Sequence, residues 1–174
     1  LFNEFWFRKT PKINSKKIIP IDNFFYPLDK IDNWNNIYGK NGFIQYQIVI
    51  PEEHSSMIKE ILVKLKQNDA LSFLPVLKRL GQQNQGYLSF PMPGWTISID
   101  LPANNKKIEK LLNSIDIDIA RIGGKIYLAK DSRQSAKILH KTYKSINIWL
   151  KQKKFLDPNN IFISDIANRL KLFN

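Results

Sequence analysis

The sequence contains no cysteine and only two histidines, which narrows the chemistry available to it. Without cysteine, the chain cannot form disulfides, thiolate nucleophiles or cysteine-based metal sites. His54 and His140 lie far apart in the sequence, which argues against a zinc site or a Ser–His relay. No apolar run approaches the ~20 residues that cross a bilayer, and the start shows no secretory signal pattern. Membrane-spanning and thiol-based functions are therefore excluded for this chain.

Acidic residues are scarce: 15 Asp and Glu stand against 27 Lys and Arg, a formal net charge of +12. Such a surface attracts nucleic acid, anionic lipid or phosphorylated ligands. An apolar content of 43% and an aromatic content of 12% indicate a globular protein. A chain of 174 residues holds one ordinary domain, or a small domain and a piece of another. Because it opens at Leu1 without Met, we expect it to continue a longer protein.

The first forty residues lack a regular pattern. Leu1–Trp6 is apolar and aromatic, typical of the end of a strand or helix. Arg8–Pro20 carries five cations and two prolines with no apolar period, which predicts a mobile basic loop, either a linker or a binding loop. The aromatic cluster Phe24–Pro27 precedes a predicted helix that Asp29 caps. One face of that helix is apolar, with Ile31, Trp34 and Tyr38.

Regular periodicity begins at Gly42. Alternating apolar residues predict four strands, at Phe43–Ile50, Ser72–Leu80, Trp95–Leu101 and Lys125–Leu128. Helical apolar spacing predicts two helices, at Ser55–Gln67 and Asn105–Ile122. The order β-α-β-β-α-β is that of a ferredoxin-like α+β fold, in which two helices cover one face of a four-stranded antiparallel sheet. Pro75 makes the second strand an edge or bulged strand.

The other face of this sheet is predicted to be polar. In the ferredoxin-like topology the first and third strands are central, so Gln45 and Gln47 should stand beside Thr96 and Ser98. A polar face that the helices leave bare can serve as a ligand platform. Amides and hydroxyls that simply face water are the alternative interpretation.

The segment Gly123–Arg133 is the second candidate site. Two glycines end a helix, a short strand follows, and Ser132 is predicted to cap the next helix, which places Lys130 in the intervening turn. Backbone N–H groups there carry partial positive charge, a setting that suits an ammonium meeting an anion or an oxygen that develops charge. The alternative is a solvated lysine. Further helices are predicted up to Phe155 and after Ser164, and Trp149 and Phe155 should need another surface to be buried.

Several short motifs, in one order and at fixed spacing, resemble the decaprenylphosphoryl-ribose 2′-oxidases, flavoproteins of the vanillyl-alcohol-oxidase type near the sugar-lactone oxidases. The resemblance runs from about Ile21 to Leu172. The motifs that carry it are Phe25-Tyr26-Pro27-Leu28-Asp29, Trp34-Asn35, Tyr38-Gly39, Gln45-Tyr46-Gln47, Leu88-Ser89-Phe90-Pro91, Pro93-Gly94-Trp95, Gly123–Arg133, Asp157-Pro158, Phe162 and Ser164-Asp165.

This resemblance implies the C-terminal part of an FAD-dependent oxidoreductase. Residues 1–124 would be the later part of a substrate-binding domain, and residues 125–174 a segment returning to the FAD domain. The enzyme would oxidise a secondary hydroxyl of a phosphorylated, polyprenyl-linked pentose by hydride transfer to flavin, and this fragment alone would be inactive. A reductase partner that completes an epimerisation, and a peripheral position at either face of the inner membrane, are also implied.

The resemblance also assigns roles to single residues. Lys130 would be the active-site lysine beside flavin and sugar, and Tyr127 would lie near the flavin. Gln45 and Gln47 would line the substrate pocket. Lys78 would suit the substrate phosphate, although Pro75 leaves open which face of the second strand carries Lys78. Two positions depart from actinobacterial members, which have Asn where Thr96 stands and Cys where Ser98 stands. Both replacements keep small polar groups in the pocket, and they leave the identity of the sugar and lipid open.

Two other functions compete with this reading. A basic ferredoxin-like sheet is also the architecture of RNA-recognition modules. That function needs exposed aromatics on the central strands, where only Phe43 is aromatic, so we expect no nucleic-acid partner. An inactive scaffold remnant is the other alternative, because the chain has no glycine-rich loop to hold a pyrophosphate.

Overall fold

A computed structural model describes residues 2–9, 16, 18–26, 32, 33, 36, 39–70, 72 and 75–173. The chain divides into two compact units, Leu1–Gly42 and Phe43–Asn174, which are described separately. The boundary expected between residues 124 and 125 concerns a longer protein and stays a prediction.

Two short helices form the described part of the first unit, α1 (Phe2–Lys9) and α2 (Ile21–Phe25). The predicted basic loop therefore starts later than expected, because Arg8 and Lys9 belong to α1, where Arg8 pairs with Glu4 one turn earlier (2.8 Å). Most of that loop, and the helix predicted after Asp29, lie outside the described residues. The first two residues of the aromatic cluster, Phe24 and Phe25, end α2, and the Phe24, Phe25 and Tyr26 side chains are exposed.

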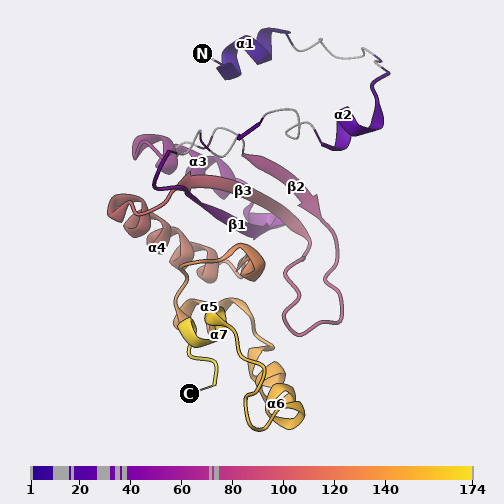
Figure 1. The fold of residues 1–174 in the computed structure, drawn as a ribbon, viewed down its shortest axis with the longest axis vertical. Helices are drawn as coiled ribbons and strands as arrows, with labels where there is room; N and C mark the ends of the chain where they lie inside the picture. Colours follow the sequence, from indigo (N-terminus) through magenta and orange to yellow (C-terminus); the bar gives the residue numbers. More distant parts are fainter. Residues whose placement is uncertain are drawn as a thin grey trace. The chain divides into compact units, whose positions relative to one another are not determined.

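A four-stranded antiparallel sheet forms the centre of the second unit (Figure 1). Its strands are β1 (Phe43–Pro51), β2 (Val76–Leu80), β3 (Gly94–Pro102) and β4 (Lys125–Ile126). They lie in the order β2-β3-β1-β4, so the first and third strands are central. A 3-10 turn η3 (Glu52–His54) and helix α3 (Met57–Gln67) follow β1, and α4 (Lys106–Arg121) follows β3. The predicted β-α-β-β-α-β order is confirmed.

The main core lies between one face of this sheet and the two helices. Alternate residues of β1 from Tyr46 to Ile50 meet the apolar stripes of α3 and α4, and together they exclude water. Helix α4 starts where the sequence predicts, because the side chain of Asn105 accepts hydrogen bonds from the N–H groups of Lys107 (3.0 Å) and Ile108 (3.2 Å).

The chain after β4 differs from its prediction in two places. The fourth strand ends at Ile126, and Leu128–Lys130 forms a 3-10 turn, η4. Ser132 does not cap a helix, because the Asp131 side chain accepts the N–H groups of residues 133 and 134 and folds a separate turn. The next helix, α5 (Ala136–Thr142), is capped instead by Ser135.

Three helices close the second unit: α5, α6 (Ile146–Leu156) and α7 (Asp165–Arg169), the last capped by Ser164 as predicted. They share a small core of their own around Leu139 and Tyr143, and Tyr143 donates to the backbone oxygen of Ile126 (2.7 Å). Trp149 packs against this core and is half-buried there, so the prediction that it needs another surface to be buried stays a prediction. Phe155 is 83% exposed, as expected of an unpartnered residue. Within the described ranges no helix has the length and apolar character to cross a membrane.

Candidate functional site

The polar platform exists where the sequence predicts it. In the antiparallel register Gln45 stands opposite Asp100, and Gln47 stands opposite Ser98. Directly opposed residues share a face, so these side chains lie on the face away from α3 and α4. Gln45 Nε2 donates to Asp100 Oδ1 (2.9 Å), and Gln47 Nε2 donates to Thr96 Oγ1 (3.0 Å). These hydrogen bonds fix the two amides across the central strands.

This face is not bare along its whole length, which corrects the prediction. Thr96 is 2% exposed, and Val49, on the same face, is fully buried. Gln47 is hydrogen-bonded to Thr96, and the segment after β4 is joined to β1 by the N–H of Tyr127, which donates to the backbone oxygen of Gln47. The β2–β3 loop is tied to β4 by Lys125 Nζ, which donates to the backbone oxygen of Ser89 (2.7 Å). The open part of the platform therefore lies toward Gln45.

Lys130 is brought onto the platform from outside the sheet. It ends the 3-10 turn η4, and its Nζ donates to Ser98 Oγ (3.3 Å). Its backbone N–H donates to the oxygen of Tyr127 (3.1 Å). Lys130 does not sit beside a helix N-terminus as predicted, because α5 begins six residues later. The ammonium is instead held by a hydroxyl of the central strand β3.

Lys78 shares the platform face, which settles the strand parity that Pro75 obscured. It stands opposite Thr96 in the β2–β3 register and is exposed. Tyr127 lies at the other side of the platform: its N–H donates to the backbone oxygen of Gln47 (2.9 Å), and its ring lies 4.6 Å from that of Phe90. All seven predicted site residues therefore belong to one face of the sheet or to the turn beside it.

Burial and two nearby charges alter the pKa of the Lys130 ammonium. Burial lowers the pKa of the Lys130 ammonium; the carboxylate of Asp100 opposes that effect, and the nearby charge of Lys78 adds to it. Strand alternation places Asp100 on this face, but its effect on Lys130 could not be predicted from the sequence, because it depends on a lysine from a distant turn. The arrangement presents two cations and several amide and hydroxyl groups to a ligand.

This electrostatic balance gives a first prediction. Lys78→Gln should raise the pKa of Lys130, because it removes a repelling charge, and Asp100→Asn should lower it, because it removes an attracting one. The rate at which acetic anhydride labels Lys130, followed by mass spectrometry across a pH series, measures this pKa. Lys66 on α3 is exposed and serves as the internal reference. Identical titration of Lys130 in both variants would contradict the described proximity of the three charges.

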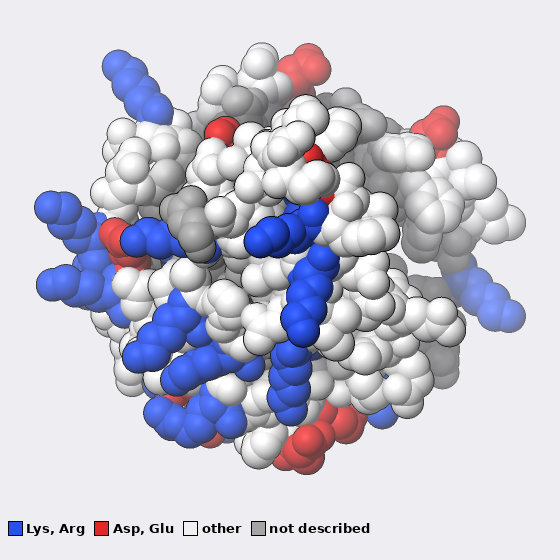
Figure 2. All heavy atoms as spheres, turned by 90° about the horizontal axis from the view of Figure 1, so that it is seen from below, with Lys and Arg blue, Asp and Glu red and all other residues white. Residues whose placement is uncertain are grey.

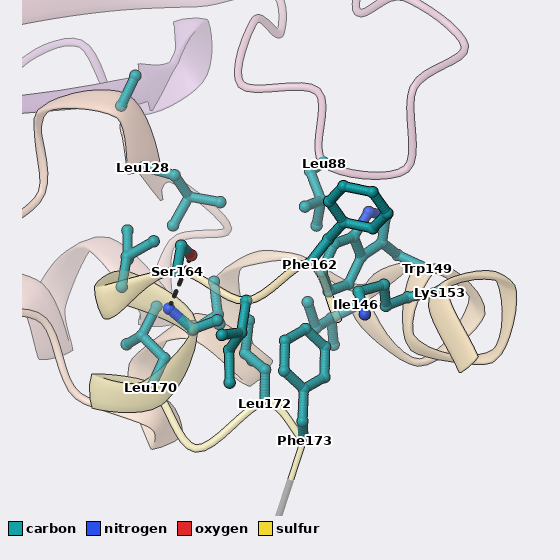
Figure 3. Close-up of a pocket in the computed structure, with 15 residues that line it drawn as sticks. Leu88, Leu128, Ile146, Trp149, Lys153, Phe162, Ser164, Leu170, Leu172 and Phe173 are labelled. Atoms are coloured by element: carbon teal, nitrogen blue, oxygen red, sulfur yellow. Dashed lines mark hydrogen bonds between the residues drawn. The ribbon is translucent and has the colours of Figure 1, made fainter. Parts of the chain in front are cut away.

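A cavity of about 520 Å³ lies among the C-terminal helices, separate from the platform (Figure 3). Figure 3 shows side chains of the β2–β3 loop, η4, α6 and the α6–α7 connection converging on it, among them Leu88, Leu128, Trp149 and Phe162. Its polar lining residues are Lys153 and Ser164. This lining suits contact with apolar groups. The platform therefore remains the candidate for chemistry, and sequence reasoning did not find this cavity because its walls come from separate segments of the chain between Leu88 and Phe173.

Positive charge is in excess at the end of the unit formed by the C-terminal helices. Figure 2, which views the molecule from that end, shows Lys and Arg side chains far more abundant than Asp and Glu. Exposed cations of these helices and their connections are Lys137, Lys141, Lys144, Lys151, Lys154, Arg169 and Lys171. Within the described part of the chain no cluster of His, Cys, Asp and Glu is arranged to hold a metal ion.

Known proteins provide an independent comparison. No family model matches the chain. It is 38% identical over 169 residues, 97% of its length, to a decaprenylphosphoryl-β-D-ribose oxidase from Mycolicibacterium smegmatis. It is 28% identical over 145 residues, 83% of its length, to an uncharacterized protein in the mprA 5′ region of Streptomyces coelicolor. The chain spans 36% and 40%, respectively, of the lengths of these two relatives. The resemblance indicated by the motifs is thereby confirmed: nearly the whole chain is similar to part of a decaprenylphosphoryl-β-D-ribose oxidase.

Proposed function

We propose that this chain is the C-terminal part of an FAD-dependent oxidoreductase that oxidises a secondary hydroxyl of a polyprenyl-phosphorylated pentose. The observation that carries the proposal is the contact between Lys130 Nζ and Ser98 Oγ (3.3 Å). This contact joins Lys130 to the polar platform on β1 and β3, although Lys130 and these two strands are far apart in the sequence. The name of the Mycolicibacterium relative, an oxidase of such a sugar, supports the reaction class.

The residues present fit one edge of a flavin rather than the whole cofactor. Lys130 is a partly buried cation held by a neutral hydroxyl, so part of its hydrogen-bonding capacity remains for an electron-rich carbonyl or alkoxide oxygen. Tyr127 is half-buried beside it and would border the same ring. When bound, FAD would supply the acceptor for the hydride. Its pyrophosphate would be held by the part of the protein that precedes this chain.

The remaining side chains of the platform would bind different parts of the substrate. Gln45 and Gln47 each have a carbonyl oxygen besides the amide nitrogen that is bonded within the platform, so they can accept hydrogen bonds from sugar hydroxyls. Lys78 is exposed on the same face and suits the substrate phosphate as a point charge. Lys130 would stabilise negative charge on the hydroxyl oxygen as its hydrogen leaves.

The proposal is tested by mixing the full-length, FAD-containing protein with a polyprenylphosphoryl pentose under anaerobic conditions. We expect the flavin absorption to bleach within one turnover, because the substrate hydroxyl delivers two electrons. The matched control is the same lipid phosphate without the sugar, which should leave the flavin oxidised. A flavin that stays oxidised with every phosphorylated pentose would overturn the proposed function.

A further inference from the structure

A buried ionic group lies beneath the platform, on the opposite side of the sheet from the proposed substrate. Arg133 pairs with Asp116 of α4, and Nη1 donates to Asp116 Oδ2 at 2.7 Å. The hydroxyl of Tyr46 donates to Asp116 Oδ1 (2.7 Å), and the Arg133 guanidinium lies 5.5 Å from the centre of the Tyr46 ring. The Asp116 and Arg133 side chains are only 2% and 11% exposed.

Stability alone does not account for this arrangement. Removing two charges from water costs free energy that their attraction repays incompletely, and apolar residues of similar volume often stabilise as well. Burial raises the pKa of Asp116 to about 6, against the opposing effects of Arg133 and Tyr46, so ionisation of this carboxyl is costly. Unlike apolar residues of similar volume, the charged pair fixes both of its partners in position, because a planar guanidinium meets a carboxylate in a defined geometry.

Arg133, which its pair with Asp116 holds in place, lies three positions after Lys130 in the chain. Between them, Asp131 Oδ1 accepts the N–H groups of Arg133 (3.1 Å) and Gln134 (2.9 Å), which makes the connection a rigid turn. Asp131 is itself paired with Arg169 of α7 (2.7 Å). Displacement of Arg133 would therefore be transmitted to the backbone of Lys130.

The other end of the group lies on the strand that carries the platform. Tyr46 is flanked by Gln45 and Gln47, whose side chains point to the opposite face of the sheet. One strand residue thus anchors the ionic group while its neighbours on either side form the site. The Tyr46–Asp116–Arg133 group therefore links the strand that carries the platform to the turn that follows Lys130.

We propose that Arg133 is a positioning residue for Lys130: its buried pair with Asp116 holds the turn after Lys130 and sets where the ammonium lies over Ser98. The expected change in the rate of flavin reduction rests on the proposed function, whereas the positioning of Lys130 by Arg133 concerns this chain alone. In this proposal Arg133 contacts neither substrate nor flavin.

The test is a double-mutant cycle in the full-length flavoprotein. Arg133→Lys keeps the charge but loses the planar fork, and it should slow single-turnover flavin reduction about tenfold, the scale of a displaced catalytic group. In a Lys130→Ala background the same substitution should cause no further loss, because the group that it positions is gone. Arg121→Lys, a substitution of a mostly exposed arginine on α4, should change neither rate. Equal slowing by Arg133→Lys in both backgrounds would overturn the proposal.

A second measurement does not depend on activity. If Arg133 holds Lys130 in its partly buried position, Arg133→Lys should return the pKa of Lys130 toward its ordinary value, as read by acetic anhydride labelling. An unchanged pKa of Lys130 in Arg133→Lys would overturn the positioning role of Arg133. If this pKa shifts as expected but Lys130→Ala does not slow flavin reduction, the proposed role of Lys130 is overturned instead. Tyr46→Phe, which keeps the ring in the core and removes only the hydroxyl, should produce a smaller shift in the same direction. It replaces Arg133→Lys if that variant fails to fold, and an unchanged titration would count equally against the proposal.

Discussion

In the proposed full-length flavoprotein, replacing Lys130 by alanine should slow the reduction of flavin by substrate about a hundredfold or more, the scale of losing one preorganised charge. The side chain approaches the platform at Ser98 Oγ, among groups that remain in place when it is removed. Its pKa is lowered by burial, so its charge acts in a partly desolvated position, where an electrostatic contact is stronger than in water. FAD itself should remain bound, because most of the contacts expected for the cofactor lie outside this chain.

The experiment is anaerobic stopped-flow bleaching of the full-length protein at saturating substrate. Lys66→Ala, which removes an exposed lysine of α3, is the matched control. Lys130→Arg should recover little, because a guanidinium spreads its charge over a plane and cannot occupy the same point. Bleaching of Lys130→Ala at the rate of Lys66→Ala would leave Lys130 as a solvated lysine without a part in the chemistry.

The sheet and its two covering helices could be predicted because each carries its pattern within one short segment. Alternation along Phe43–Ile50 and Trp95–Leu101 assigns every side chain to a face, and the strand order then follows from the topology. The platform residues Gln45, Gln47, Thr96 and Ser98 were therefore identifiable before their contacts were known. Lys78 required the register with β3, since Pro75 interrupts its strand pattern.

The segment around Lys130 was harder to predict, because its conformation depends on distant partners. Ser132 has the composition of a helix cap, but Asp131 takes the local N–H groups and is in turn held by Arg169, 38 residues away. Likewise Asp116 interrupts the apolar stripe of α4 as an ordinary polar residue would, and only the fold shows Tyr46 and Arg133 beside it. Strand alternation assigns Thr96 to the platform face but does not describe its burial there, where Gln47 Nε2 donates to its Oγ1.

Gly94→Ala should destabilise the protein strongly, because this glycine lies where β3 meets the end of β1. A Cβ atom at Gly94 would fall 2.1 Å from the backbone oxygen of Ile50, and the residue has a φ of +152°. The near atoms belong to the backbone of Ile50 and Pro51, which cannot move without shifting the central strand β1. Overpacking and backbone strain each cost about 1–3 kcal/mol. We expect a loss of about 3 kcal/mol or more, which corresponds to a fall in Tm of roughly 6–12 °C for the unit that contains the sheet.

Gly81→Ala is the matched control, since it lies just past the end of β2 with nothing within 4 Å of an added Cβ. It should change the free energy of unfolding by less than about 0.5 kcal/mol. Thermal unfolding of the two variants, followed by circular dichroism, makes the comparison. Because Gly94 begins the strand that carries Thr96 and Ser98, any Gly94→Ala protein that folds must have moved these residues relative to Gln47. Its flavin reduction should therefore fall as well, and equal stability and activity of the two variants would contradict the described pairing of β1 with β3.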